Sequence, residues 1–321
     1  MIGDGDAVTR EEVRWAYRTF LEREPESDEA IAAHMTADDL GTLARRFIES
    51  AEFRQRQSLP VMRSRFVPLD AEANLVEVDI DGATLATLVA HVRRCWEFLG
   101  RDRPHYSVLT HAAFRPDALP ENETAFWASG EHEAEMLIRI LKRHGIGSTT
   151  PLACIDFGCG VGRVTAPLAE RFATVHAYDI SEPHIEIAKT RTDRAVFHVV
   201  RDLPVALAPA DIFHSRIVFQ HNPPPIIAML IRSALGCLKP NGIAVFQVPT
   251  YEMGYRFKAR GYIERMNREV LDMEMHCLPQ EHIFRIAEDS GCRILEVRED
   301  GSAAGAGRTI SNTFVVQCPL H

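Results

Sequence analysis

The chain has 321 residues, and its 45 Asp and Glu outnumber its 36 Lys and Arg, which gives a formal net charge of −9 at pH 7. Nucleic-acid binders need clustered positive side chains, so this balance argues against DNA or RNA as a partner. The length predicts a main domain with one or two smaller units, and a hydrophobic content of 46% is enough to build a sizeable core.

The cysteine pattern and the N-terminal residues indicate the cellular compartment of the protein. Seven cysteines are dispersed, odd in number and never spaced as C-x-x-C, so neither a disulfide framework nor a zinc site is expected. The first residues lack the apolar stretch of a signal peptide. No run approaches the roughly 18 apolar residues of a membrane span. These features predict a cytoplasmic protein without a membrane span, and they leave the oligomeric state open.

Residues 1–57 are predicted to form a small helical domain. Thr9 is placed to cap a helix, and Glu12 three residues later completes a capping box. Apolar residues recur at helical spacing between residues 40 and 48, which predicts a second amphipathic helix.

Residues 58–115 are predicted to bridge this domain and the main one. Imperfect apolar alternation predicts a short strand over 75–80. A helix is predicted over 83–99, with Val92 and Trp96 on its apolar face and Gly100 at its end.

Residues 116–321 are predicted to form the main α/β domain. A helix over 134–144 is followed by strands at 152–157, 175–179, 196–200, 212–218 and 243–248, with helical segments between them. This alternation predicts a parallel sheet with helices on both faces. Two late strands, 294–298 and 313–317, have no obvious helix between them and predict a hairpin at the end of the sheet.

The segment that follows the first of these strands carries the functional signal. Gly158, Gly160 and Gly162 form a Gly-x-Gly-x-Gly turn, preceded on the strand by Asp156. Glycines there permit positive φ and let a ligand lie against bare backbone. A second acid, Asp179, ends the next strand, where a ribose-binding carboxylate is expected in a nucleotide-binding sheet. A nicotinamide cofactor and S-adenosylmethionine share this architecture.

Four segments favour the second cofactor. IDFGCGVGRVTAPLAERF (155–172) is similar to motif I of class I S-adenosylmethionine-dependent methyltransferases, and AYDIS (177–181) to their post-I motif. RDLP (201–204) follows the third strand, where family members use an acid near the adenine. LKPNGIAVFQVPTY (238–251) resembles the family's LkPGG turn, with Asn241 in place of the first glycine. Asparagine also tolerates the αL conformation of such a turn, so the replacement is compatible with it. The resemblance covers roughly residues 115–321. It implies a Rossmann-like domain with a seven-stranded, mostly parallel sheet and a reversed C-terminal strand, and S-adenosyl-L-methionine as cofactor.

The resemblance also implies the cofactor-binding residues. These are Ser129, Gly130, Asp156, Gly158, Gly160, Gly162, Arg163, Asp179, Ile180, Asp202, Leu203 and Gln220. Asp156 and the glycines would face the methionine end, Asp179 the ribose hydroxyls and Asp202 the adenine amino group. FWASGE (126–131) would form a flap that places Ser129 and Gly130 near the cofactor carboxylate. Simpler structural interpretations stay open, with Asp202 in a surface turn, Arg163 covering the surface and FWASGE packing on the sheet.

The segment SRIVFQHNPPP (215–225) is predicted to form the binding site for the substrate that accepts the methyl group. It resembles the LQHIPP signature of a bacterial methyltransferase subgroup. His221 is predicted as a general base, with a structural loop histidine as the alternative. Asn222 and the prolines after it resemble the Asn-Pro-Pro-Tyr/Phe tetrad of nitrogen methyltransferases, but the aromatic residue is missing and the segment sits one step late. We therefore expect an oxygen acceptor, with nitrogen as the alternative. Tyr251, Tyr255 and Tyr262 predict either an aromatic lid or an ordinary connection.

The substrate class is inferred from the N-terminal domain. YRTFLEREP (17–25) and FIESAEFR (47–54) resemble a small bacterial helical domain related to phycobilisome linker segments. That domain often accompanies sugar-modifying enzymes, which implies docking or assembly and a small polar molecule or a glycan intermediate as substrate. Two rival functions remain, a nicotinamide-dependent oxidoreductase and a non-catalytic cofactor-binding module.

Overall fold

The computed structural model describes residues 8–21, 23–53, 67–68, 70–266, 271–303 and 309–319. The chain divides into two compact units, residues 1–68 and residues 69–321. The described residues of the predicted bridge from Asp70 onward therefore belong to the second unit. No described helix is long and apolar enough to cross a membrane.

The first unit contains the helices α1 (Arg10–Leu21), α2 (Asp28–His34) and α3 (Leu40–Glu49). The capping box is confirmed, because the Thr9 amide donates to the Glu12 carboxylate at 2.8 Å and the Glu12 amide donates to Thr9 Oγ1 at 3.3 Å. Tyr17 packs edge-on against Phe47 with ring centroids 4.9 Å apart, which joins α1 to α3. Arg54 and the predicted boundary at residue 57 lie outside the described residues.

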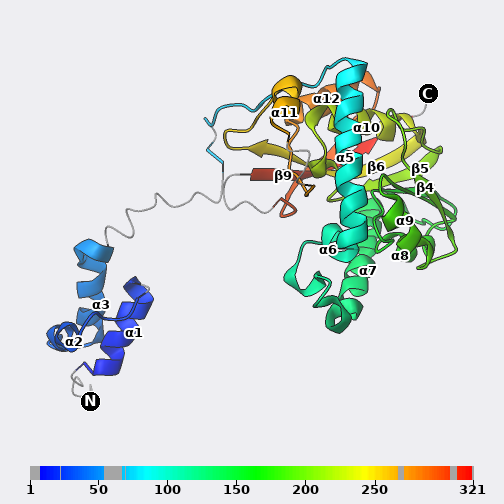
Figure 1. The fold of residues 1–321 in the computed structure, drawn as a ribbon. Coiled ribbons are helices and arrows are strands. Elements are labelled where there is room, and N and C mark those ends of the chain that lie inside the picture. Colours follow the sequence, from blue (N-terminus) through cyan, green and yellow to red (C-terminus); the bar gives the residue numbers. More distant parts are fainter. Residues whose placement is uncertain are drawn as a thin grey trace. The chain divides into compact units, whose positions relative to one another are not determined.

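The second unit is built on a seven-stranded sheet (Figure 1). Its strands are β2 (Ala153–Phe157), β3 (Thr174–Asp179), β4 (Ala195–Val199), β5 (Ala210–Ser215), β6 (Leu238–Glu252), β8 (Arg293–Asp300) and β9 (Thr309–Gln317). They lie in the order β4-β3-β2-β5-β6-β9-β8, and β9 runs antiparallel to both of its neighbours. The predicted Rossmann-like sheet with a reversed C-terminal strand is confirmed. Asn241 adopts a φ of 63°, as its place in the turn before the fifth predicted strand requires.

Helices cover both faces of this sheet. The apolar side chains of α7 (Leu119–Arg143) and α8 (Thr165–Ala169) pack on one face, and those of α10 (Pro224–Gly236) and α12 (Gln280–Asp289) pack on the other. Another helix, α9 (Glu182–Lys189), follows β3. On the face of α10, aromatic rings stack across neighbouring strands, with Phe157 and Phe213 centred 5.8 Å apart.

Phe213 lies at the centre of this core and is 1% exposed. We expect Phe213→Ala to lower the free energy of unfolding by about 3–5 kcal/mol, because it removes buried apolar surface and leaves a cavity. Urea unfolding measures the change. Phe284→Ala is the control, since Phe284 is 44% exposed and should cost less than about 1 kcal/mol. Equal losses for the two variants would contradict this account of the core.

The helix α5 (Gly82–Asp102) lies N-terminal to the sheet strands and is the long cyan helix of Figure 1. Asp81 caps it by accepting a hydrogen bond from the Thr84 amide at 2.9 Å. The prediction that Gly100 ends the helix is wrong, because α5 continues to Asp102. A Cβ at Gly100 would lie 2.5 Å from Ser181 Oγ, so the glycine instead allows α5 to approach the start of α9 closely.

Shorter elements complete the unit. These are α6 (Pro104–Val108), the 3₁₀ turns η1 (Ala112–Phe114) and η2 (Phe219–His221), α11 (Ala259–Arg265), and the parallel pair β1 (Leu75–Val76) and β7 (Arg256–Phe257). The strand predicted over 75–80 is therefore shorter than expected. Val78 and Ile80 pack on the core without a strand partner, because the facing strand has only two residues.

Cys292 and Cys318 form a disulfide, a single pair that the dispersed cysteines did not predict. The register of the β8–β9 ladder explains the pairing, since Arg293 lies opposite Gln317 and brings the next residues together. The other five cysteines are free. No group of three or more His, Cys, Asp or Glu side chains suited to a metal is found in the described ranges.

Candidate functional site

The turn between β2 and α8 depends on its glycines. Gly158, Gly160 and Gly162 have φ values of 76°, 52° and 80°, a region that residues with a side chain rarely adopt. A Cβ on Gly158 would lie 2.2 Å from the Val218 side chain, and one on Gly160 would lie 2.6 Å from Val108. The turn is therefore both conformationally and sterically restricted to glycine.

Asp179 holds this turn against the end of β3. Its Oδ2 accepts a hydrogen bond from the Gly160 amide and its Oδ1 accepts one from the Ser181 amide, both at 2.8 Å. Ser181 Oγ in turn donates to the Trp96 carbonyl on α5 at 3.0 Å. The carboxylate is thus fixed by backbone donors on both sides.

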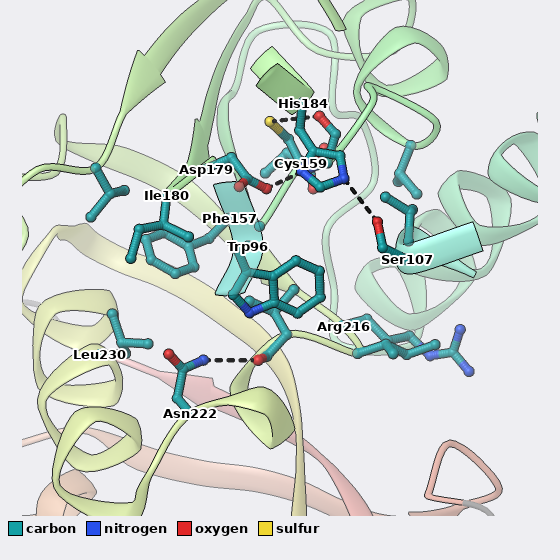
Figure 2. Close-up of a pocket in the computed structure, with 18 of the residues that line it drawn as sticks. Trp96, Ser107, Phe157, Cys159, Asp179, Ile180, His184, Arg216, Asn222 and Leu230 are labelled. Atoms are coloured by element: carbon teal, nitrogen blue, oxygen red, sulfur yellow. Dashed lines mark hydrogen bonds between the residues drawn. The ribbon is translucent and has the colours of Figure 1, made fainter. Parts of the chain in front are cut away.

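A pocket of about 1060 Å³, its open mouth included, lies at the carboxyl ends of β2, β3 and β5 (Figure 2). This is the edge at which ligands bind in open parallel sheets. Its lining combines the glycine turn, the strand ends, one side of α5 and the start of α10, and includes Val92, Trp96, Ser107, Glu133, Asp156, Gly158, Gly160, Arg163, Asp179, Ile180, His184, Leu203, Arg216, Asn222 and Leu230.

One part of the lining carries an excess of positive charge. Glu133 of α7 forms ion pairs with two arginines. Its Oε2 lies 3.0 Å from Arg163 Nη2 and 3.2 Å from Arg216 Nη1, so two guanidinium groups share one carboxylate. Burial raises the pKa of Glu133, but the two arginines outweigh burial and hold the pKa below its ordinary value. Arg163 Nε is buried without a hydrogen-bond partner in the described structure. The cluster therefore retains one surplus positive charge and an unused donor.

Asp156 contributes a negative charge to the same pocket. Asp156 is 3% exposed, and Thr165 Oγ1 donates to Oδ2 at 2.6 Å. His214 Nδ1 lies 3.5 Å from Oδ1. The carboxylate is thus placed to bind a cationic group beside the arginines.

The other part of the lining is apolar. Figure 2 shows Ile180, Leu230 and Asn222 on one side of the Trp96 ring, with Arg216 and Ser107 on the other. Asn222 is the polar side chain labelled at this apolar end. The pocket therefore suits a ligand with a charged end and a flat apolar end.

Comparison with known families agrees with this geometry. The model of a methyltransferase domain matches residues 129–297, which is more than half of the 321-residue chain. The chain belongs to this methyltransferase family. The matched region begins within α7, so α5, which supplies Trp96 to the pocket, lies outside it.

Comparison with solved structures finds similar methyltransferases. Magnesium protoporphyrin IX methyltransferase from Synechocystis PCC 6803, with bound SAH, is 16% identical with a TM-score of 0.50, over 71% of this chain and 98% of that one. A putative sarcosine dimethylglycine methyltransferase from Galdieria sulphuraria is 14% identical with a TM-score of 0.44, over 59% and 86%. At these identities the likeness concerns the fold alone. No curated protein matches the chain.

Membership of the methyltransferase family implies S-adenosyl-L-methionine as the methyl donor. The residues of the pocket fit this cofactor. The surplus charge of the cluster of Glu133, Arg163 and Arg216 suits a carboxylate, and Asp156 suits an ammonium group. Asp179 suits ribose hydroxyls, and the apolar end suits a planar base.

The structure brings together many of the residues predicted to bind the cofactor. Those that line the pocket are Asp156, Gly158, Gly160, Arg163, Asp179, Ile180 and Leu203. Their roles toward the methyltransferase cofactor stay predictions, now supported by a shared location.

Other predicted residues lie behind the lining. Ser129 Oγ accepts a hydrogen bond from Arg163 at 3.1 Å, and a Cβ on Gly130 would lie 2.0 Å from the Arg163 carbonyl oxygen. Gly162 packs against Ala188 in the same manner, with a hypothetical Cβ 3.1 Å away. These residues therefore position the pocket rather than form its surface.

Asp202 and Gln220 also lie outside the lining. Asp202 is exposed in the segment after β4, which agrees with its interpretation as a surface turn residue. Gln220 is buried and its Oε1 accepts a hydrogen bond from Gln247 at 3.1 Å.

The segment predicted to form a flap, residues 126–131, is helical. These residues lie inside α7, which begins at Leu119 with Pro120 in its first turn, a position that favours proline. Trp127 Nε1 donates to Glu123 one turn earlier at 3.0 Å. Gly130 lets this helix approach Arg163 closely.

His221 lies behind Trp96 and is not part of the lining. The two rings are 5.2 Å apart at an interplanar angle of 63°. Its Nδ1 donates to the Glu274 carbonyl at 2.9 Å, and its Nε2 lies 3.2 Å from the Gln220 amide nitrogen. Burial lowers the pKa of His221 to about 4. Both ring nitrogens are thus occupied, which favours a positioning role over a catalytic one.

Sequence reasoning missed part of the pocket wall. Trp96 and Val92 were recognised as an apolar helix face, but nothing local indicated that this face lines the pocket. His184 is also new. Its Nε2 lies 2.9 Å from Ser107 Oγ, and that hydroxyl donates to the Pro104 carbonyl, so Nε2 carries the proton.

The tyrosines after β6 are held by hydrogen bonds. Tyr255 pairs with His276 Nδ1 at 2.8 Å, and Tyr262 donates to Glu274 at 2.6 Å. Tyr251 donates to the Glu72 carbonyl at 3.1 Å. None of these tyrosines lines the pocket, which favours the ordinary connection over the aromatic lid.

Proposed function

We propose that this protein is an S-adenosylmethionine-dependent O-methyltransferase that acts on a small polar molecule or a glycan intermediate. The observation that carries the proposal is the meeting of the glycine turn, Asp179 and the charged cluster of Glu133, Arg163 and Arg216 in one pocket. When bound, the cofactor supplies an electrophilic methyl group. The glycan suggestion comes from the resemblance of the N-terminal helical domain and remains part of the proposal.

The chain's own residues would supply binding and orientation, which is the main requirement of an in-line methyl transfer. The backbone of the glycine turn and Asp179 form one rigid edge of the pocket. Trp96 of α5 forms another wall of the same pocket. Ser181 fixes that wall to Asp179 through its backbone and side chain.

The location of Asn222 bears on the nitrogen alternative for the acceptor atom. In nitrogen methyltransferases an Asn-Pro-Pro segment holds the amine, and Asn222 was the feature that favoured this alternative. Here Asn222 follows η2 and lies with Leu230 at the apolar end of the pocket, across Trp96 from Arg216. The alternative therefore loses its main support.

Transfer of a ¹³C-labelled methyl group tests the proposal. Candidate sugars, hydroxy acids and amines would be incubated with labelled cofactor, and a carbon–proton correlation spectrum of the product distinguishes O-methyl from N-methyl groups. An O-methyl product is expected. An N-methyl product would overturn the oxygen assignment, and a lack of label in every acceptor class would count against the substrate class proposed.

His221 is expected to position Trp96 rather than to remove a proton. With a pKa of about 4, His221 is neutral at physiological pH in the wild type. We expect His221→Phe, which keeps a ring against Trp96, to retain the wild-type pH profile of kcat/KM between about pH 6 and 9. A base role would instead require an apparent pKa in the wild-type profile that disappears in the variant.

A further inference from the structure

Asn222 is a polar side chain in an apolar part of the pocket. It is 8% exposed and lies in the lining together with Ile180, Leu203 and Leu230. It follows η2 directly, and Pro223 begins the entry into α10. A polar group in such surroundings lowers its free energy when a ligand offers a partner.

The orientation of the Asn222 amide is determined by its neighbour. Nδ2 donates to the Val218 carbonyl oxygen at 2.9 Å. A flipped amide would place Oδ1 against that carbonyl, where neither oxygen has a proton to donate. Oδ1 is therefore directed away from Val218, on the side of Leu230 in Figure 2, and accepts no hydrogen bond from the described part of the chain.

An acceptor without a protein partner at the apolar end of the pocket suits a ligand with a donor on a flat apolar body. The adenine base has this chemistry, since its exocyclic amino group donates from one edge of an aromatic ring. The charged groups that suit the amino-acid part, Arg163 and Arg216, line another part of the pocket. The residue expected for this task, Asp202, is exposed and outside the lining.

We propose that Asn222 recognises the adenine of the cofactor, by accepting a hydrogen bond from its amino group at Oδ1. This inference rests on the proposed function, and it assigns base specificity to the start of α10 instead of the segment after β4. The Val218 carbonyl is a positioning group, because it holds the amide in the accepting orientation.

Calorimetric titration with S-adenosylhomocysteine and S-inosylhomocysteine tests the proposal. The inosyl compound carries a carbonyl oxygen in place of the amino group and so sets an acceptor against Oδ1. We expect the wild type to prefer the adenosyl compound by about tenfold or more. Asn222→Leu should reduce this preference to within about twofold. Asp202→Leu is the matched control and should keep the full preference.

The ratio of the two affinities separates recognition from a general structural effect, which would weaken both ligands alike. Asn222→Ala is the second variant, to be used if Asn222→Leu does not fold. A wild-type preference that survives in the Asn222 variants, or that disappears in Asp202→Leu, overturns the proposal. Equal wild-type affinities overturn adenine recognition alone, whereas a wild type that binds neither compound refutes the proposed function as well.

Discussion

Replacement of Asp179 with alanine is expected to reduce the affinity for S-adenosylhomocysteine by at least about 100-fold. The two ribose hydroxyls of the ligand would lose a charged acceptor, and hydrogen bonds to a charged group contribute about 1.5–3 kcal/mol each. The substitution also removes the acceptor for the Gly160 and Ser181 amides, which lie 2.8 Å from the carboxylate oxygens. The substitution therefore removes a partner of the glycine turn as well as the group that would bind the ligand. Isothermal titration calorimetry measures the change.

Asp202→Ala is the matched control for this experiment. Asp202 is an exposed acid that was also predicted to bind the cofactor, but it lies outside the pocket lining. We expect its substitution to change the affinity by less than about twofold. A large loss in Asp202→Ala with little change in Asp179→Ala would contradict the assignment of the ribose-binding acid.

Arg163→Met is expected to lower the free energy of unfolding by about 3–5 kcal/mol, because it leaves a buried carboxylate with only one of its two partners. Arg163 and Glu133 are each 7% exposed in their side chains and lie 3.0 Å apart. Chemical denaturation at neutral pH measures this loss. Arg139→Met breaks an exposed pair with Glu135 on the same helix and should cost less than about 1 kcal/mol.

The loss caused by Arg163→Met should depend on pH. The pKa of Glu133 lies below the ordinary value of 4.5, so the pairing stabilises the folded state above that pH. As the pH falls through the lowered pKa, Glu133 becomes protonated and this stabilisation is lost. The difference between wild type and variant should therefore shrink below pH 4.5. A difference that is independent of pH, or similar to that of Arg139→Met, would argue against a buried ion pair.

The sequence predicts the features that depend on local backbone geometry. The three glycines of the turn adopt positive φ, and Asn241 does the same at the turn inside β6. The strand and helix pattern also predicts the order of elements from β2 to β9, because β2, β5 and β6 contain apolar runs and turns or helical segments separate the strands from β2 to β6. The pattern also locates Asp179, because this residue ends a predicted strand, and the carboxyl ends of the strands line the pocket.

The residues that were missed or misplaced depend on packing between distant segments. Trp96 reaches the pocket because Gly100 lets α5 approach Ser181, a contact across about 80 residues of sequence. His221 lies behind that tryptophan, so its motif position alone did not reveal its surroundings. Asn222 lines the pocket while Asp202 does not, and only the path of the chain around η2 distinguishes them.

We expect S-adenosylmethionine to bind in the pocket that the glycine turn and Asp179 line. Titration of the wild-type protein with S-adenosylmethionine, S-adenosylhomocysteine and NAD, followed by calorimetry, tests it most directly. We expect micromolar binding of both sulfur compounds and no binding of NAD. Binding of NAD, or of none of the three, would contradict the assignment of the glycine turn, Asp179 and the charged cluster to this cofactor.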